Sequence, residues 1–228
     1  ISIQHLSFER GRVAVVLRGS DPVSDANREF IADRRRNADE ALKKCLASLP
    51  AIPETRMDVI SERLLVFQEL RPLADRNLSL PRRQRDGELV FRWYTAATDL
   101  IESLKYAADV LIGKYIPGDA RRIATFASTA LELRITAGAE ATVVAQSASE
   151  GKMVSSETMG RIHRLRGIED RLWYEIDLNT GYIKVNKLKK MAAEIRNVHM
   201  TELRAKQDLV LADLNGGRTP SVTVNELT

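Results

Sequence analysis

Apolar side chains recur every three or four positions along most of this chain, which is the period of an α-helix with one face in a core. The clearest run is Met57, Ile60, Leu64, Phe67 and Leu70. No stretch sustains the alternation of apolar and polar side chains that a half-buried strand requires. The pattern therefore predicts an all-α fold.

Glycine, proline and serine residues mark the ends of the predicted helices. Gly19 and Pro22 end the first helix, because glycine terminates helices and proline cannot continue them, and Ser24 can cap the second. Residues 71–87, which include the basic run 82–85, predict an exposed loop. Long helices joined by short turns are expected to pack as antiparallel, up-and-down bundles. The helices are predicted at about residues 1–19, 24–49, 57–70, 88–116, 120–149, 155–179 and 185–214.

The two halves of the chain resemble each other. Each half has a short pattern around a glycine, and this pattern pairs Gly11 with Gly138. An arginine-rich amphipathic helix follows in each half. The matching segments are residues 6–16 and 133–144, then 36–42 and 166–172. Their order predicts a duplicated helical unit, with two modules at about residues 1–116 and 117–228.

The composition is that of a helical protein with a mixed, solvated surface. Hydrophobic residues make up 44% and charged residues 29%, so the chain can bury a core, and Gly (12) and Pro (7) are too scarce for a loop-rich fold. The net charge of +4 is spread along the chain, which leaves open both a plain surface and a role in binding an anion. The lysines between 184 and 190 could bind phosphate, but aromatic side chains for base stacking are missing there, so no nucleic acid partner is expected.

Cys45 is the one cysteine, so no internal disulfide can form, and its helical spacing predicts a small buried side chain.

The sequence starts at Ile1 without an initiator methionine. It contains neither a signal peptide nor an apolar run of the roughly 18 residues that span a bilayer. We interpret it as a piece of a longer protein, which fits a domain between two membrane spans and also fits any other excised domain.

The stretch Leu6-Ser7-Phe8-Glu9-Arg10-Gly11, followed by an arginine-rich helix, resembles the opening of extracytoplasmic helical sensor domains. Such domains occur in bacterial histidine kinases, diguanylate cyclases and chemoreceptors. The nitrate- and nitrite-sensing domain is the best-known relative with this opening. In the second half, residues 131–138 and 162–167 with Trp173 resemble the matching repeat, and residues 216–224 resemble the segment that leads back to the membrane.

This resemblance implies a homodimeric receptor domain of two helical bundles on the periplasmic side of the inner membrane. It implies arginines that bind a small anionic ligand, or a surface for a periplasmic binding protein, and a cytoplasmic output domain of a two-component system or cyclase. The chain departs from the pattern at Ala137-Gly138-Ala139, because the first repeat has Arg10-Gly11-Arg12 there. The second repeat therefore lacks the matching arginine for nitrate.

Arginine is the side chain best suited to an oxyanion, because its planar guanidinium can donate to two oxygens at once. The candidate ligand-binding residues are Arg10 and Arg12 in the first half and Arg134 and Arg166 in the second. Each has a glycine or alanine nearby, which would let another helix approach closely. The alternative is that each forms an ion pair with Glu9, Glu132 or Glu169 where two helices meet.

Other candidates for chemistry are weaker. Trp93, Tyr94 and Trp173 could line a ligand pocket, and they could equally fill the core. The three histidines have no spacing typical of a metal site, and phosphate-binding or nucleophile motifs are missing. We therefore expect no metal, no cofactor and no catalytic residue.

The sequence as a whole predicts a non-enzymatic ligand-sensing module. Ligand would favour one packing of the bundle over another and so signal to the output domain. The alternative is a helical structural or partner-binding module with no small-molecule site. A basic helical domain that binds nucleic acid is a third possibility, against which the even spread of charge argues weakly.

Overall fold

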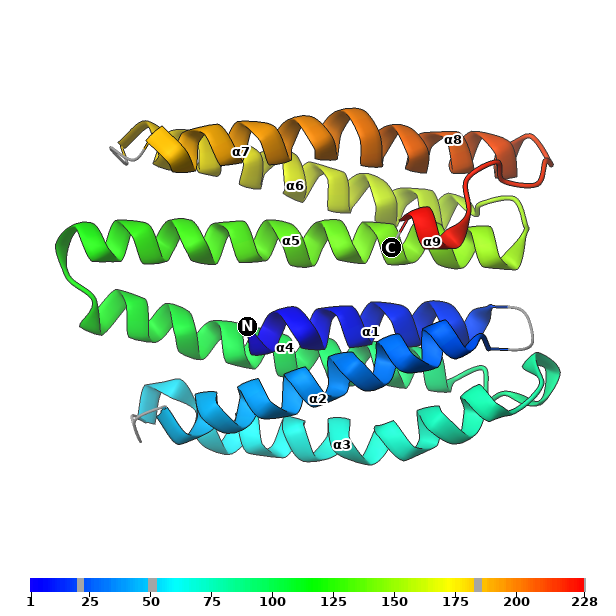
Figure 1. Cartoon of the computed structure of the whole chain (residues 1–228), viewed down its shortest axis with the longest axis horizontal. Coiled ribbons are helices and arrows are strands. Elements are labelled where there is room, and N and C mark those ends of the chain that lie inside the picture. Colours follow the sequence, from blue (N-terminus) through cyan, green and yellow to red (C-terminus); the bar gives the residue numbers. More distant parts are fainter. Residues whose placement is uncertain (20–22, 49–52, 183–185, 228) are drawn as a thin grey trace. The chain divides into compact units, whose positions relative to one another are not determined.

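The computed structural model describes residues 1–227 except 20–22, 49–52 and 183–185 (Figure 1). These residues contain no strand, so the predicted all-α fold is confirmed. Short 3-10 turns, Pro53–Thr55 and Arg82–Gln84, precede α3 and α4, and a π-helical segment, His199–Leu203, joins α7 to α8. The helices are α1 (Ser2–Arg18), α2 (Asp25–Ser48), α3 (Met57–Ser79), α4 (Leu89–Tyr115), α5 (Gly118–Glu150), α6 (Ser156–Tyr182), α7 (Asn186–Val198), α8 (Arg204–Asn215) and α9 (Val224–Leu227).

The chain divides into two compact units, unit 1 (Ile1–Tyr115) and unit 2 (Ile116–Thr228). The boundary expected from the sequence, between residues 116 and 117, lies next to this division. It falls at the connection between α4 and α5, where Pro117 precedes the first residue of α5.

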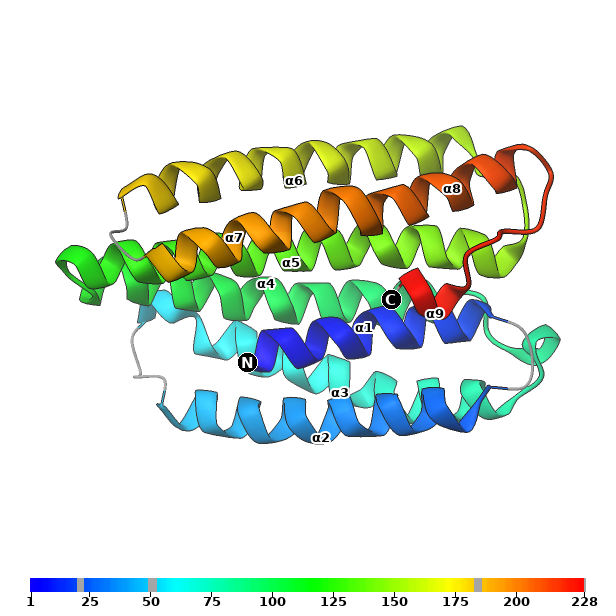
Figure 2. The same cartoon turned by 45° about the horizontal axis from the view of Figure 1, so that its top comes forward.

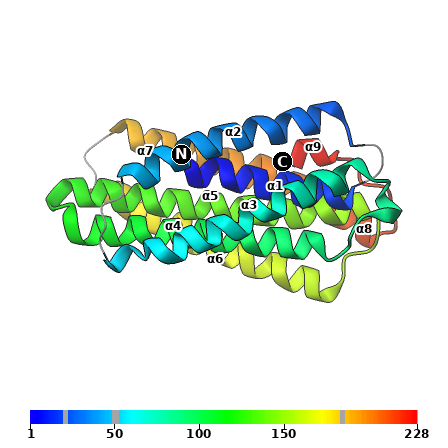
Figure 3. The same ribbon diagram turned by 90° about the horizontal axis from the view of Figure 1, so that it is seen from below.

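Unit 1 contains four long helices that run along a common direction (Figures 1 and 3). Helix α1 packs on α2 and α4, and α3 packs mainly on α4. Trp93 of α4 is fully buried, and its ring centroid lies 4.8 Å from that of Phe67 on α3. The indole Nε1 of Trp93 donates to the carbonyl of Arg10 at 3.2 Å. Trp93 therefore joins three helices in the core of unit 1.

Unit 2 is built from α5, α6 and the continuous rod formed by α7, the π segment and α8 (Figure 2). Helix α6 packs along α5, and α8 and the short α9 also lie against α5. A core cluster holds Leu133, Leu172, Trp173 and Ile176. Helix α9 follows the third long helical segment of unit 2 (α7 to α8) and a connecting loop, as α4 follows α3 in unit 1.

Several predicted helix ends are confirmed. Helix α1 ends at Arg18, and the amide of Gly19 donates to the carbonyls of Val15 and Val16. Ser24 caps α2, because its Oγ accepts from the amide of Asn27 at 3.3 Å. Ser155 caps α6 through the amide of Thr158 in the same way. The breaks expected at residues 20–22 and 50–52, and the start of the last helix at Val185, lie outside the described residues.

The loop predicted at residues 71–87 is wrong for its first half, because α3 continues through Pro72 to Ser79. Proline lacks the amide proton that an interior helical position uses. Ala74 and Leu78 are nevertheless buried, and Asp75 is held by Arg35 of α2. These tertiary contacts outweigh the local cost of the proline, so only residues 80–88 connect α3 to α4.

Two smaller predictions are also wrong. Helix α6 continues past its predicted end at Asn179 and ends at Tyr182, since Thr180 is buried and donates to the carbonyl of Asp177. Cys45 is half-buried rather than buried. Within the described part of the chain, no helix is both long and apolar enough to cross a membrane.

Candidate functional site

Two of the four candidate arginines, Arg10 and Arg12, lie in α1. Arg10 is buried, donates to Thr98 Oγ1 at 3.0 Å, and its guanidinium lies 4.7 Å from the ring centroid of Tyr94. Arg12 donates to Asn27 and lies 4.7 Å from the ring centroid of Phe30. The two side chains therefore contact different helices, α4 and α2, and do not converge on one point.

The other two candidates lie in unit 2. Arg134 is half-buried on α5. Arg166 of α6 is held between two carboxylates, with Nε 2.6 Å from Glu140 Oε1 and Nη1 2.7 Å from Asp208 Oδ1. An arginine that already faces two carboxylates is less available to an added anion. The ion-pair alternative drawn from the sequence thus describes Arg166, although its partners are not the nearby Glu169.

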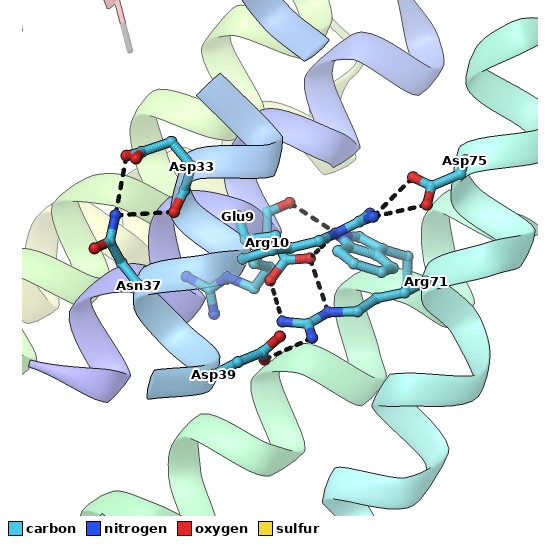
Figure 4. Close-up of polar contacts among 9 residues, drawn as sticks. Glu9, Arg10, Asp33, Asn37, Asp39, Arg71 and Asp75 are labelled. Atoms are coloured by element: carbon cyan, nitrogen blue, oxygen red, sulfur yellow. Dashed lines mark hydrogen bonds and ion pairs between the residues drawn. The ribbon is translucent and has the colours of Figure 1, made fainter. Parts of the chain in front are cut away.

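A buried carboxylate, Glu9, organises unit 1 (Figure 4). Its side chain is completely buried, and it accepts from Arg35 Nε at 2.6 Å and from Arg71 Nη2 at 2.8 Å. Each arginine also reaches an exposed aspartate on the other's helix: Arg35 bonds Asp75 and Arg71 bonds Asp39, both at 2.7 Å. These five residues, the unit 1 network, tie α1, α2 and α3 together.

Unit 2 contains the same arrangement, the unit 2 network. Glu140 of α5 is completely buried and accepts from Arg166 of α6. Arg166 bonds Asp208 of α8, and Arg204 of α8 bonds Asp170 of α6 at 2.9 Å. In both units the first arginine follows the buried glutamate by 26 residues. In each network, two neighbouring helices exchange a pair of arginine–aspartate bonds, one in each direction, and a third helix supplies the buried glutamate.

These equivalences fix the register of the internal repeat. The register that aligns Glu9 with Glu140 also aligns Arg35 with Arg166, because the spacing from glutamate to arginine is the same in both units. In this register Gly11 corresponds to Thr142, so the expected pairing of Gly11 with Gly138 is wrong.

The second arginines of the two networks, Arg71 and Arg204, align with each other only if this register is shifted slightly. Arg204 lies slightly farther along the chain than the register of the glutamates would place it. The π segment explains part of the shift, since a π turn takes one residue more than an α turn.

The networks differ because three buried apolar positions of unit 1 carry polar side chains in unit 2. The register of the glutamates pairs Ala38 with Glu169, and the shifted register that aligns Arg71 with Arg204 pairs Ala74 with Gln207. Phe67 precedes Arg71 by one α turn, and in unit 2 the residue one π turn before the arginine is His199. All six side chains are buried: Ala38, Ala74, Phe67, Glu169, Gln207 and His199.

Glu169 changes how the buried glutamate is held. Arg204 Nη2 donates to Glu169 Oε2 at 3.1 Å, so one arginine, Arg166, bonds to Glu140 in the described residues instead of two. The side chains of Glu140 and Glu169 lie close enough to interact electrostatically. Burial, together with the neighbouring Glu169 charge and despite the opposing bond from Arg166, raises the pKa of Glu140 to about 7. Glu140 therefore keeps its proton to a higher pH than an ordinary glutamate does.

The same contacts act in the opposite direction on Glu169. Burial alone would raise the pKa of Glu169, but its polar contacts with His199, Glu140 and Arg204 outweigh burial, and the pKa lies below its usual value. Trp173 Nε1 donates to His199 Nδ1 at 3.1 Å, so neutral His199 carries its proton on Nε2. That nitrogen lies 3.2 Å from Glu169 Oε2, off the line of a good hydrogen bond.

The added polar groups leave buried atoms without hydrogen-bond partners in the described residues of unit 2. They are Glu140 Oε2, Arg166 Nη2, Glu169 Oε1, His199 Nε2, Arg204 Nε and both amide atoms of Gln207. In the unit 1 network only Arg35 Nη2 is in this state among the described atoms. Unpartnered buried polar atoms cost free energy, so the unit 2 network is costly where the unit 1 network is nearly satisfied.

Comparison with family models, curated proteins and solved structures finds no match to this chain. Among the described residues, no group of three or more His, Cys, Asp and Glu side chains is arranged to hold a metal ion.

Sequence reasoning missed Glu140, Arg35, Arg71 and Arg204, and it named Glu9 only as a possible ion-pair partner of a candidate arginine. A signal was present. An arginine followed four residues later by an aspartate occurs at Arg35, Arg71, Arg166 and Arg204, once in each helix of the two crossed pairs. On a helix these two side chains share a face, and here each one pairs with the neighbouring helix instead of its own.

Proposed function

We propose that this chain is a non-enzymatic sensory region of a membrane-bound bacterial receptor, and that unit 2 is its responsive half. The proposal unites the resemblance of the α1 and α2 sequences to periplasmic sensor domains with one observation. Unit 2 has Glu169, His199 and Gln207 at buried positions where the repeated unit has alanine or phenylalanine.

A structural role alone gives no reason for this exchange. Buried apolar side chains of suitable volume usually stabilise a fold at least as well as buried charges do. A sensor, in contrast, needs two packings that differ by only a few kcal/mol, so that a stimulus can shift the balance between them. A polar interior with unsatisfied atoms supplies such a small difference.

A small anion is the ligand class that the resemblance implies. Both arginines are paired with carboxylates through their other nitrogens, but Arg166 Nη2 and Arg204 Nε are buried guanidinium donors without a partner in the described residues, and an anion in unit 2 could accept from them. Binding there would compete with Glu140 and Glu169 for the same two guanidinium groups. The bound state would then differ from the free state in how α5 is tied to α6 and α8.

A thermal-shift titration tests this proposal. Nitrate, nitrite and small carboxylates are added to the wild-type chain, and a ligand of the native state raises Tm by mass action. We expect Arg166→Lys to abolish the rise, because lysine keeps the charge but loses the planar fork. The matched control is Arg35→Lys, its counterpart in unit 1, which should keep the rise.

Three other outcomes would be decisive. A rise that survives in Arg166→Lys and is lost in Arg10→Ala would move the site to unit 1. No rise with any anion would reject a small-anion sensor. A rise that neither variant changes would show that binding does not use these arginines.

The second candidate function, a module that binds a protein partner, is favoured by one surface. Met191, Ile195 and Val198 form a row on α7 and are 44%, 57% and 50% exposed. Helix α7 has no buried residue. The alignment that pairs Phe67 with His199 pairs Arg63 with Ile195, and Arg63 donates to the carbonyl of Asp99 and to Ser103 on α4.

Ile195 of this row therefore corresponds to a residue of α3 that bonds to α4. We infer that the partner covering the row is an amphipathic helix lying as α4 does on α3. A labelled peptide of residues 88–115 is a direct probe. Saturable binding by fluorescence anisotropy, lost in Ile195→Asp, would support the partner-binding function. No binding, or binding unchanged by Ile195→Asp, would contradict it.

A further inference from the structure

We propose that Glu140 and Glu169 form a proton-operated switch in unit 2, in which loss of one buried proton loosens the attachment of α5 to α6 and α8. The inference names the regulation of the site described above, and it rests on the proposed function only for its use as a signal. The switch itself stands on the arrangement of charges.

Charge balance is the first argument. The unit 1 network has two arginines and three carboxylates, Glu9, Asp39 and Asp75. The unit 2 network has two arginines and four carboxylates, because Glu169 joins Glu140, Asp170 and Asp208. One proton bound by Glu140 or Glu169 gives the unit 2 network the same net charge as the unit 1 network. Without it, two buried carboxylates face each other in a medium of low dielectric constant, where repulsion is strong.

The surrounding charges do not replace this proton. Helix α6 presents Arg166, Glu169 and Asp170, and α8 presents Arg204 and Asp208. The π segment presents His199, whose Nδ1 already accepts from Trp173. Both arginines are committed to exposed aspartates as well as to the buried glutamates. Helix α9, which packs on α5, contributes only Glu226, which is exposed and bound to Thr223.

The geometry also gives the proton a path to a structural response. Glu140 is attached to α6 only through Arg166 in the network, whereas Glu9 is held by two arginines. The second arginine of unit 2, Arg204, begins α8 directly after the π segment. Such π turns are frequent at functional sites, and this one carries His199 against both Glu169 and Trp173. A change at the glutamate pair therefore reaches the rod formed by α7 and α8.

The experiment is a pH titration from 5 to 9 of the tryptophan fluorescence of the whole chain. Trp173 reports on unit 2 through its contact with His199, and Trp93 lies in the core of unit 1. We expect one transition near neutral pH that fits a single proton. It should disappear in Trp173→Phe, which assigns the signal to unit 2. Glu140→Gln, which mimics the protonated side chain, should abolish the transition, and the matched control Glu9→Gln should keep it.

Glu169→Ala provides a second variant if Glu140→Gln does not fold. This substitution places at residue 169 the alanine that unit 1 has at the equivalent Ala38, and it frees Arg204 to bond to Glu140. It should therefore also remove the transition. A transition that persists in both variants, or none between pH 5 and 9 in the wild type, would overturn the proposal. Repeating the titration with and without nitrate separates the two ideas: a proton transition without a nitrate effect keeps the switch and rejects the anion sensor, and the reverse result rejects the switch.

Discussion

Glu9 and Glu140 occupy equivalent positions in the two units but are not equally bound. Both are completely buried, and both accept from an arginine Nε at 2.6 Å. Glu9 has a second arginine, Arg71, whereas in unit 2 the second arginine turns to Glu169. One glutamate is therefore a satisfied structural centre, and the other is left with an unpartnered oxygen.

The first prediction concerns the satisfied centre in unit 1. Arg71→Met should lower the free energy of unfolding by about 3–5 kcal/mol, because it removes one partner of a buried charge. Asp39→Asn removes the exposed end of the same interaction and should change it by no more than about 1 kcal/mol. Urea denaturation followed by circular dichroism measures both. Equal effects of the two variants would show that Glu9 is not the centre of the network.

The second prediction concerns the polar positions of unit 2. Gln207→Ala, which restores the residue of unit 1, should stabilise the chain by about 1–3 kcal/mol, because both amide atoms of Gln207 are buried without a partner. The reverse change, Ala74→Gln, should destabilise unit 1 by a similar amount. Urea midpoints of both variants test this. A loss of stability in Gln207→Ala would indicate that the amide makes bonds which stabilise the fold.

The third prediction is the effect of pH on stability. The pKa of Glu140 is raised in the folded chain, so folding binds a proton between its ordinary value of 4.5 and about 7. The unfolded state binds fewer protons in that window, and the free energy of unfolding should fall as pH rises through it. The pKa of Glu169 is lowered, so its contribution should be lost as pH falls below 4.5.

These two effects place the greatest stability on the acid side of neutrality. Urea denaturation of the wild type and Glu140→Gln at pH 5, 6, 7 and 8 measures how the free energy of unfolding changes as pH rises. The wild type should lose stability across the series, and Glu140→Gln should not. Parallel curves for the two proteins would contradict the assignment to Glu140.

The fourth prediction concerns Pro72. An alanine at this position adds the missing helical hydrogen bond and removes the clash of the proline ring, and it loses the stiffness that proline gives the unfolded chain. We expect Pro72→Ala to raise stability by about 1–3 kcal/mol, measured by urea denaturation. Pro81→Ala, outside the helices, is the control and should change stability little. A destabilised Pro72→Ala would mean that α3 uses the proline to bend.

Local sequence signals were sufficient for most of the fold. Apolar periodicity and end signals such as Ser24 located the helices, because these depend on neighbours within a few residues. Pro72 misled the prediction, since α3 continues past it with contacts from a distant part of the chain, such as the bond from Arg35 to Asp75. The π segment at residues 199–203 has no sequence signature of its own and lies inside a regular helical pattern.

The candidate site was less accessible. Arg166 was identified, but its partners Glu140 and Asp208 come from two other helices. The meaning of Glu169 emerges only when it is matched with Ala38, and that match requires the correct register of the repeat. The glycines gave a different register, because Gly11 and Gly138 are not equivalent positions once the buried glutamates are aligned.

The most direct test of the account is native-state hydrogen exchange of the whole chain at pH 6 and pH 8, corrected for the intrinsic exchange rates. The two units serve as controls for each other, because they contain equivalent networks and differ in Glu169, His199 and Gln207. We predict that protection around Glu140 and Glu169 falls at pH 8, while protection around Glu9 and Arg35 stays constant. Equal changes in both units, or no change in either, would contradict the claim that unit 2 is the responsive half.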